Sequence, residues 1–235
     1  MAGCAPVSDP DTTAPSASAL RLVVAAERLF AQHGIDGVSL RQIAAEAGSA
    51  NNSAVHYHFG SKAALIAAIF RQRLPRLIDE RRLLFARCEP DGLRARLEAH
   101  FLPVFSLAEA TDNHYVSFVE QLQRHALASQ EGLLDLPPEG QRSNDEFRAD
   151  LERLLDDLPD PLRQLRIAEA QALCIHAAAD RERAVNSGAA SAPFELFAGS
   201  ILDGITGFLT APPSVATQRW LRGARQHADR ALRLL

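Results

Sequence analysis

The chain has 235 residues, which is enough for one large domain or for a small domain followed by a medium-sized one. Hydrophobic residues make up 47% and charged residues 23%, as in ordinary globular proteins, and the formal net charge is −4. Three widely separated cysteines (Cys4, Cys88 and Cys174) provide neither a disulfide framework nor a zinc motif. With no apolar run of membrane-spanning length and no signal peptide, we expect a cytoplasmic chain without membrane contact.

The charge is distributed unevenly along the chain. Residues 20–74 carry six cations against three anions, whereas residues 75–235 carry 19 arginines against 24 acids. A basic N-terminal module on an acidic remainder fits contact with nucleic acid, because phosphate attraction acts at the contacting surface. The excess is also small enough to arise by chance, so it does not decide the partner.

Residues 1–19 contain much Ala, Pro, Ser and Thr and are expected to form a disordered tail. After them, strand-like alternation is absent, and helix-forming residues dominate. Ser39 and Gln42 form a capping box, a glycine follows each of the three short helices, and Pro75 is expected to bend the longer helix that comes next. These four helices are predicted at about 20–33, 39–47, 51–58 and 62–87.

The remaining helices are separated by loops that contain Pro and Gly. Ser143 and Glu146 form a capping box for the third of them, and Asp160 followed by Pro161 is a favourable start for the fourth. They are predicted at about 92–107, 113–129, 143–157, 161–186, 194–210 and 214–235. The prediction is therefore an all-α protein, with a three-helix head over residues 20–61 and a body of about six helices over residues 62–235.

Residues 39–58 carry the features of a helix-turn-helix motif. Two short helices are joined by a turn that contains Gly48, which lets one helix cross the DNA backbone while the next enters the major groove. The second helix, beginning near Asn51, is short and polar, and asparagine can form two hydrogen bonds with adenine. Ser39, Tyr57 and Lys62 flank it with hydroxyl and cationic groups of the kind that bind phosphates.

The segment VSLRQIAAEAGSANNSAVHYHFGSKAAL, residues 38–65, resembles the DNA-binding head of the TetR family. That family has a Thr/Ser-x-Arg-x-Ile-Ala helix, a turn, a helix ending in Tyr-x-His-Phe or similar, and then Ser-Lys-x-x-Leu. The matching residues are Ser39, Arg41, Ile43, Ala44, Gly48, Tyr57, His58, Phe59, Ser61, Lys62 and Leu65. The resemblance covers about residues 20–72. The turn is one residue longer than usual, which leaves open which of Asn51, Asn52 and Ser53 faces the bases.

The resemblance implies that Arg41 projects into the major groove, where it can bind guanine; a phosphate contact or a plain surface position is the alternative. Asn52 and Ser53 are the best candidates for base contacts, followed by His56. Tyr57, His58 and Lys62 are expected to bind phosphates, as their family counterparts do, although His58 can instead bond to a carbonyl at the helix end. Ser39 can cap its helix while its N–H meets a phosphate. The predicted DNA-binding set is Ser39, Arg41, Asn51, Asn52, Ser53, His56, Tyr57, His58 and Lys62.

One head of this size makes too few contacts for specific binding, so we expect a homodimer that binds palindromic double-stranded operator DNA. The resemblance implies that the two helices over 161–186 and 194–210 form a four-helix bundle across the dimer axis. Ordinary core packing is the alternative for some of their apolar residues. The predicted interface comprises Leu165, Ala168, Ala172, Ile175, Ala179, Phe197, Ile201, Ile205 and Phe208.

The resemblance also implies an apolar pocket for an unknown small-molecule effector within residues 75–190. Residues of this kind are more often plain core residues than ligand contacts, so core packing is the alternative for each candidate. The candidates are Phe101, Phe105, Tyr115, Phe118, Leu122, His125 and Phe147.

The function implied is a ligand-responsive transcriptional regulator, most simply a repressor that a small apolar or amphipathic effector releases from DNA. No catalytic motif, cofactor motif or metal-ligand spacing is present, so we predict no enzyme, no cofactor and no metal. His176 and Asp180 share a helix face, but two ligands are too few for a metal site. A helical protein-interaction adaptor and a small helical enzyme without DNA binding remain the alternatives.

Overall fold

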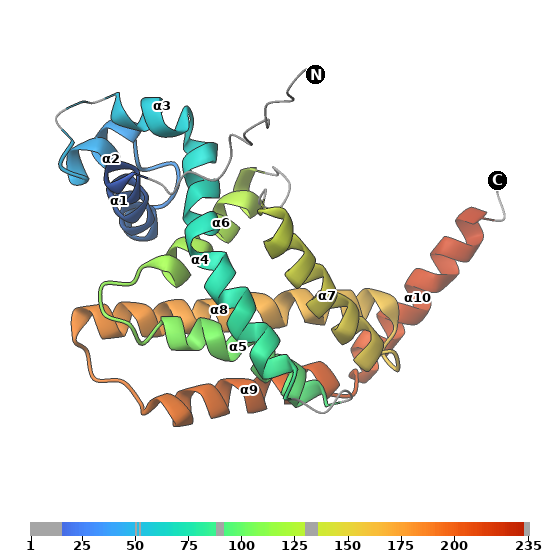
Figure 1. Ribbon diagram of the computed structural model, residues 1–235. Coiled ribbons are helices and arrows are strands. Elements are labelled where there is room, and N and C mark those ends of the chain that lie inside the picture. The colour runs from blue at the N-terminus through green and yellow to red at the C-terminus, as the bar shows by residue number, and fades with distance from the viewer. Residues whose placement is uncertain (1–15, 50, 52, 88–91, 130–135, 233–235) are drawn as a thin grey trace, which may run out of the picture.

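A computed structural model describes residues 16–49, 51, 53–87, 92–129 and 136–232, which form ten helices and no strand (Figure 1). This confirms the prediction of an all-α protein. The first three helices form the head at one end of the molecule, and the helices of the body lie below it in the view of Figure 1. Of the predicted tail, residues 1–15 lie outside the described part of the chain, and the first helix already begins within the remainder of that tail.

The head consists of α1 (Ala17–His33), α2 (Leu40–Glu46) and α3 (Ala54–Phe59). The capping box at the start of α2 is confirmed: the Ser39 hydroxyl accepts from the Gln42 N–H at 3.3 Å, and the Gln42 side chain accepts from the Ser39 N–H at 2.8 Å. Gly34, Gly48 and Gly60 follow the three helices with positive φ angles, which glycine adopts without a Cβ clash. The three predicted helix ends therefore hold.

Helix α4 (Lys62–Phe85) connects the head to the body. The Ser61 hydroxyl caps its start, and Pro75 lies inside it. Two polar contacts join it to the head. The ammonium group of Lys62 donates to the carbonyl of Ile35 at 2.9 Å, and Arg73 donates two hydrogen bonds to the nearly buried carboxylate of Glu27 on α1. The orientation of the head is thus tied to the first half of α4.

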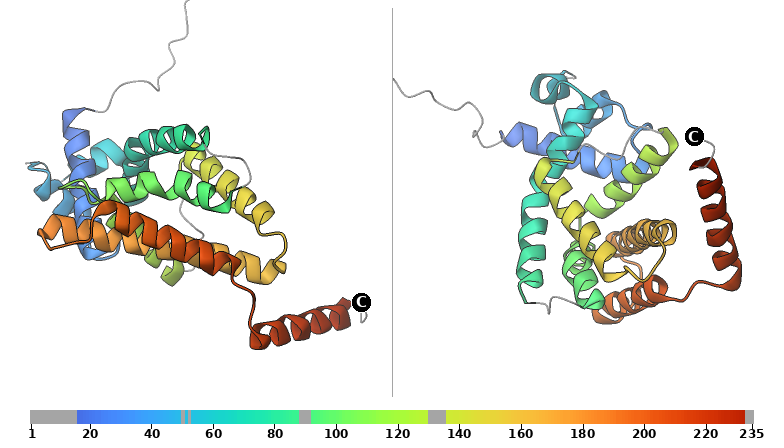
Figure 2. Two further views of the ribbon diagram at one scale, coloured as in Figure 1. Left: turned by 90° about the horizontal axis from the view of Figure 1, so that it is seen from below. Right: turned by 90° about the vertical axis from the view of Figure 1, so that its right-hand side faces the viewer.

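Beyond α4 the structure describes six further helices, as the sequence predicted. They are α5 (Leu93–Leu107), α6 (Tyr115–Ser129), α7 (Pro138–Leu154), α8 (Asp160–Ser187), α9 (Phe194–Thr210) and α10 (Val215–Leu232). The predicted start of α7 at Ser143 is wrong: the helix begins five residues earlier, because Pro138 occupies the first helical position, where its missing N–H costs nothing. Helix α10 extends away from the rest of the body (Figures 1 and 2).

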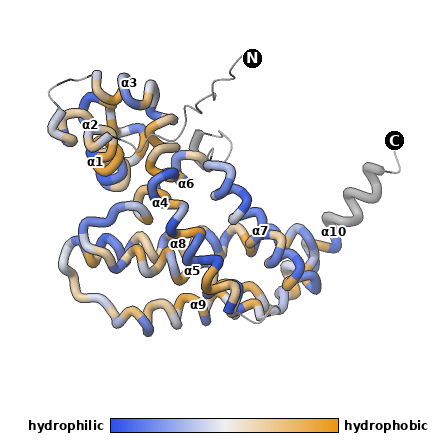
Figure 3. Tube along the Cα trace, viewed as in Figure 1, coloured by the Kyte–Doolittle hydropathy of each residue, from blue (hydrophilic) through white to orange (hydrophobic). Residues whose placement is uncertain are grey.

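Apolar residues recur along the helices between hydrophilic ones, as amphipathic helices around a shared core require (Figure 3). One continuous core runs from the head into the body, and Phe30 of α1, Phe70 of α4 and Phe118 of α6 meet in it. Helix α6 packs along α1 on one side and along α8 on the other. The body therefore touches the head through α6 as well as through α4.

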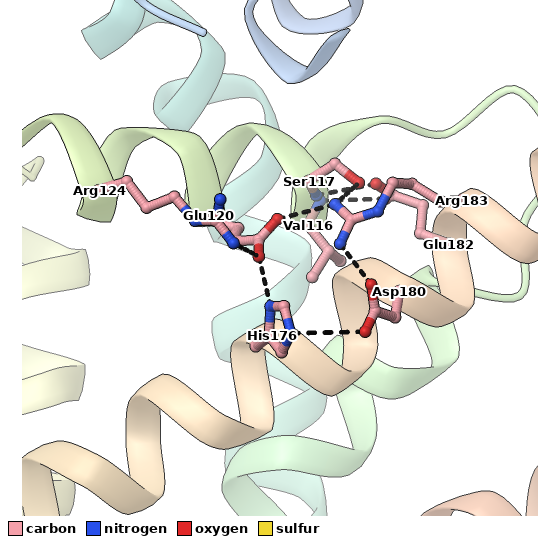
Figure 4. A network of polar contacts seen from close by, with 8 residues as sticks. All are labelled: Val116, Ser117, Glu120, Arg124, His176, Asp180, Glu182 and Arg183. Carbon is pink, nitrogen blue, oxygen red and sulfur yellow. Dashed lines mark hydrogen bonds and ion pairs between the residues drawn. The ribbon is translucent and has the colours of Figure 1, made fainter.

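Carboxylates of α6 and α8 join these two helices through polar contacts (Figure 4). The fully buried carboxylate of Glu182 accepts from the N–H groups of Val116 and Ser117 at 3.0 and 2.8 Å, so a side chain of α8 caps the start of α6. In the same pair of helices, the buried Glu120 accepts from the more exposed Arg183 at 2.7 Å and His176 at 2.5 Å.

Among the described residues, no single helix is both long and apolar enough to cross a membrane. Helix α9 and the first part of α10 meet the criterion of length and composition only as a pair, which is bent by 50°.

Candidate functional site

Helices α2 and α3 form the helix-turn-helix, and their core residues hold it on α1. Ile43 and Ala44 of α2 and Val55 of α3 are buried, and Phe59 is half-buried against the same core. An ion pair between Arg28 of α1 and Glu46 of α2 adds a polar contact at the edge. The packing of Val55 and Phe59 into the head turns the opposite side of α3 toward solvent.

The turn between α2 and α3 is built from local side-chain hydrogen bonds. The side-chain oxygen of Asn51 accepts from the backbone N–H of Ser53 at 2.8 Å. The Ser49 hydroxyl accepts from the backbone N–H of Asn51 at 3.3 Å. The helix that was predicted from residue 51 therefore begins only at Ala54. Asn51 and Ser53 lie in the turn rather than on the helix, and Asn52 lies outside the described residues.

In addition to Asn51 in the turn, five of the residues predicted to bind DNA are exposed on this surface: Ser39, Arg41, Ser53, His56 and Tyr57. Tyr57 is 83% exposed, although tyrosine is normally at least partly buried. An aromatic side chain this open on a short polar helix is accessible to another molecule.

The alternative to phosphate binding considered for His58 was a bond to a carbonyl at the helix end, and in the structure this bond belongs to another histidine. It is the imidazole Nδ1 of His56, not His58, that lies 3.0 Å from a carbonyl at the helix end, that of Gly60. This contact orients the ring, and no residue in the described part of the chain bonds to Nε2, which can therefore face a ligand. His58 is half-buried, and its ring packs edge-on against Tyr57 and at a tilt against Phe59.

Lys62 is also half-buried, because one of its N–H groups donates to the carbonyl of Ile35. An ammonium group has three N–H donors, so two remain for a phosphate.

The body contains a cavity of about 130 Å³ between α4, α5 and α7. Its apolar walls come from Ile78, Phe85, Ala99 and Phe147, and its polar walls include Arg81 and His100. The ring of His100 stacks on Phe147 with centroids 3.6 Å apart. Burial, and then the positive charge of Arg81, lower the pKa of His100 well below its ordinary value, so the ring is neutral.

Of the seven residues predicted to line a pocket, Phe147 lines this cavity and the other six do not. Phe101, Phe105, Tyr115 and Phe118 are almost fully buried and pack on other aromatic rings, and Leu122 is buried with them. These five belong to the core, which was the alternative reading of each. His125 lies 3.0 Å from the carboxylate of Asp36, so it forms a contact between α6 and the head.

Sequence reasoning missed the polar walls of the cavity. Arg81 donates to the carbonyl of His100 at 3.1 Å and to the hydroxyl of Ser143 at 3.4 Å. Arg96 is bound to Asp150 at 2.7 Å and lies over the ring of Phe85, 3.3 Å from its centroid. Two arginines on α4 and α5 carry no sequence signal of burial, because burial of a charged side chain depends on which helices meet there.

The outer faces of α8 and α9 carry four large apolar side chains that the protomer leaves exposed: Leu165 and Leu173 on α8, and Leu196 and Phe208 on α9. Arg166 of α8 donates to the carbonyls of Leu209 and Ala211, so the start of α8 lies beside the end of α9 and the two helices run antiparallel. A Cβ added at Gly204 or Gly207 would meet nothing within 4 Å, so the α9 surface is also flat there.

The residues predicted for the dimer interface divide into three groups. Ala179 and Ile205 are buried inside the protomer, so for these two the prediction is wrong; their apolar character serves the protomer's own core. Ile175, Phe197 and Ile201 are half-buried. The exposed members are Leu165, Ala168, Ala172 and Phe208.

Within the described part of the chain, no group of three or more metal-ligating side chains comes together. Cys174 is buried on α8, and burial raises the pKa of its thiol to about 12, which leaves it protonated and unreactive.

Comparison with known proteins assigns the head. Residues 22–69 match the family model described as bacterial regulatory proteins of the tetR family. The head is therefore similar to that of the TetR family over these residues. Its members are regulatory proteins, so the expectation of a regulator rather than an enzyme agrees with the assignment. No curated protein matches the sequence.

Solved structures share the TetR-family fold over most of this chain. FadR of Bacillus halodurans, a fatty acid degradation regulator, has a TM-score of 0.54 at 15% identity, covering 84% of this chain and 99% of that one. A TetR-like regulator from Rhodococcus sp. RHA1 has a TM-score of 0.53 at 18% identity, covering 85% and 100%. GusR of Salmonella enterica has a TM-score of 0.51 at 19% identity, covering 85% and 98%. At these identities the likeness concerns the fold.

Proposed function

We propose that the chain is a homodimeric repressor that binds palindromic operator DNA through α2 and α3 and releases it when a small effector binds the body. The observation that carries the proposal is the exposed polar surface of the helix-turn-helix, with Tyr57 83% exposed beside His56 and Arg41, on a three-helix TetR-family head. A surface of this kind supplies both hydrogen-bond donors for base edges and groups for phosphates.

The individual DNA contacts follow from where the side chains lie. Ser53 and His56 are at the exposed start of α3, the end of a recognition helix that reaches base edges. Arg41 projects from α2 and is long enough to reach a base or a phosphate. Tyr57 and the two remaining donors of Lys62 are suited to phosphates. Asn51 holds the turn, so we assign it a positioning role.

A second copy is expected on the outer faces of α8 and α9. Large apolar side chains that a folded chain leaves exposed are candidates for an interface, and here both helices of an antiparallel pair carry them. Gly204 and Gly207 let another helix approach closely. An isologous pairing would make a four-helix bundle and place one head at each end of a twofold assembly, as a palindromic operator requires.

Regulation follows from the position of α4. This helix carries one wall of the cavity at Ile78 and Arg81, and its first half is bound to the head through Lys62 and Arg73. An effector that binds one arrangement of α4 more tightly than another shifts the spacing of the heads, and the change in DNA affinity equals the ratio of its two affinities.

A mobility-shift assay tests the proposal with DNA from the region upstream of the protein's own gene. We expect retardation that weakens steeply with salt, by about 10³-fold or more between 50 and 200 mM if six or more phosphates are contacted. Arg41→Ala should reduce the affinity at both salt concentrations. The matched control is Arg76→Ala, an exposed arginine of α4 that lies outside the head.

Two results would refute the proposal. Failure of the dimeric protein to retard any upstream fragment would favour the helical adaptor, or an enzyme if a substrate is turned over. Equal losses of affinity for Arg41→Ala and Arg76→Ala would show that retardation does not depend on the helix-turn-helix surface.

A further inference from the structure

The cavity between α4, α5 and α7 contains one guanidinium group that differs from the other arginines around it. Arg96 forms an ion pair with Asp150, Arg142 with Glu139, and Arg82 with Asp79. Among the residues that the structure describes, no carboxylate forms an ion pair with Arg81.

The hydrogen bonds of Arg81 leave most of its donors unused. A guanidinium has five N–H groups. In the described part of the chain, those of Arg81 donate only to two neutral acceptors, the carbonyl of His100 and the hydroxyl of Ser143. These two contacts direct the group at the place where α4, α5 and α7 face the cavity. The remaining N–H groups are available to a ligand with paired acceptors.

The electrostatics at Arg81 support the same conclusion. Burial lowers the pKa of Arg81 to about 10, because the charged form has lost water and gained no anionic partner. A cation in this state gains more from an added anion than an arginine already bound to a carboxylate does.

Part of the remaining lining is apolar, and charged side chains, among them Glu139, Glu146 and Asp150, complete it. The stacked rings of His100 and Phe147 form a flat wall, and Phe85, Ile78 and Ala99 supply further apolar surface. The volume of about 130 Å³ is close to that of cavities that hold a single benzene ring, about 150 Å³.

We propose that the effector is a small carboxylic acid, bound through its carboxylate by Arg81 and Ser143 and through a ring or short chain by Phe147 and Phe85. This proposal rests on the function proposed above and names the chemistry of its effector. A planar carboxylate can accept two parallel hydrogen bonds from a guanidinium, whereas a neutral amide or alcohol cannot neutralise its charge. Binding would draw α4, α5 and α7 together at Arg81, on the helix that leads to the head.

Calorimetric titration and thermal unfolding of the full chain with matched probes test the proposal. The probes are benzoate against benzamide, and hexanoate against hexanamide. We expect at least one carboxylate to bind about ten- to a hundredfold more tightly than its amide, the ratio expected for charge-assisted hydrogen bonds. The same carboxylate should raise the melting temperature in proportion to the logarithm of its concentration.

Variants locate the binding group. Arg81→Gln should lose the preference for the carboxylate, and Arg81→Lys should keep part of it because it retains the charge without the paired donors. The matched control, Arg76→Gln on the exposed side of the same helix, should bind like the wild type. Equal affinity for carboxylate and amide in the wild type would overturn the proposal, and this comparison requires no variant to fold. Absence of binding by both carboxylates, or an unchanged preference in Arg81→Gln, would also overturn it.

The proposed effector chemistry and the proposed repressor function can be refuted independently of each other. If the protein retards operator DNA but shows no preference for carboxylates, the effector chemistry is wrong and the regulator stands. If it binds carboxylates at Arg81 but no DNA, the site stands and the repressor does not.

Discussion

Arg73 of α4 donates two hydrogen bonds, of 2.6 and 2.8 Å, to the carboxylate of Glu27 on α1, whose side chain is 4% exposed. The geometry is the bidentate one that gives guanidinium–carboxylate pairs their directional strength. The hydrogen bonds and then the charge of Glu27 raise the pKa of Arg73 against the opposing effect of burial. This pair fixes the angle at which the head meets α4.

Glu27→Gln should lower the free energy of unfolding by about 3 kcal/mol, because it leaves the partly buried guanidinium of Arg73 without its counter-charge. Urea denaturation measures the change. The double variant Glu27→Met with Arg73→Met should recover much of the loss, since two apolar side chains need no partner. If the double variant is as unstable as the sum of the two single variants, the pair does not act as a unit.

Glu182 should give stability an unusual dependence on pH. Burial raises the pKa of its carboxyl, although hydrogen bonds from Ser117 and Val116 act in the opposite direction. The folded state therefore binds this proton at pH values where the unfolded state has released it, and the contribution to stability is lost as pH rises from the ordinary glutamate pKa through the raised one. Relative to Glu182→Gln, the wild type should lose stability with rising pH in that window, by at most about 1.4 kcal/mol per pH unit.

Glu120 provides the control, since it lies in the same pair of helices and has a shift of opposite sign. Burial acts to raise the pKa of Glu120, but hydrogen bonds from Arg183 and His176 outweigh it and the pKa is lowered. Its contribution is present above the ordinary glutamate pKa and is lost as pH falls through the lowered value. Relative to Glu120→Gln, the wild type should gain stability with rising pH; slopes of equal sign for the two variants would contradict the assignment.

Arg41→Ala and Lys62→Met should weaken DNA binding in distinguishable ways. Lys62→Met removes a phosphate-binding charge, so the slope of log affinity against log salt should fall by about one, and it also removes the bond to Ile35, so the head should melt earlier. Arg41 is exposed, so its removal should leave the melting temperature unchanged. A tenfold or larger loss of affinity with an unchanged salt slope identifies a base contact of Arg41, and a slope lowered by one identifies a phosphate.

Leu165→Glu and Phe208→Glu should convert the dimer to a monomer. Each places a charge on both sides of the proposed interface and removes apolar burial worth about 1.5–3 kcal/mol per side chain, so the dimer should weaken by about a hundredfold or more. Light scattering after size-exclusion chromatography measures the mass. Leu83→Glu is the control, because Leu83 is equally apolar and 62% exposed but lies on α4. Monomeric Leu83→Glu beside dimeric Leu165→Glu would place the interface elsewhere.

Local signals in the sequence determined much of the fold correctly. The Ser39–Gln42 box and the glycines at 34, 48 and 60 act within one helical turn, and the helix ends they predict hold. The predicted start of α7 was wrong because this segment carries two local start signals. The helix begins at Pro138, in the first helical position, and not at the Ser143–Glu146 box. The predicted start of the third helix was wrong because the side chain of Asn51 forms a hydrogen bond within the turn, which keeps this residue out of the helix.

The candidate site was less predictable because it depends on contacts between distant segments. Phe105 and Phe118 were predicted as pocket-lining residues with core packing as the alternative, and the structure buries both in the core, because an apolar sequence pattern cannot tell a wall of a cavity from the middle of a core. Ala179 and Ile205 failed for the same reason, since a stripe on a helix shows that a face is covered and not by which partner. The cavity is defined by Arg81 and His100, whose burial follows only from the meeting of α4 with α5 and α7.

Pro75 lies in α4 between Arg73, which holds α1, and Arg81, which faces the cavity. A proline has no N–H to offer the carbonyl four residues earlier, so the backbone ladder is interrupted at Arg71. The helix continues through the proline with this one backbone hydrogen bond missing, so the turn around Pro75 is held less firmly than its neighbours. Movement at the cavity would reach the DNA-binding surface as a swivel about this joint, so the amplitude of the response would depend on the stiffness of a single helical turn.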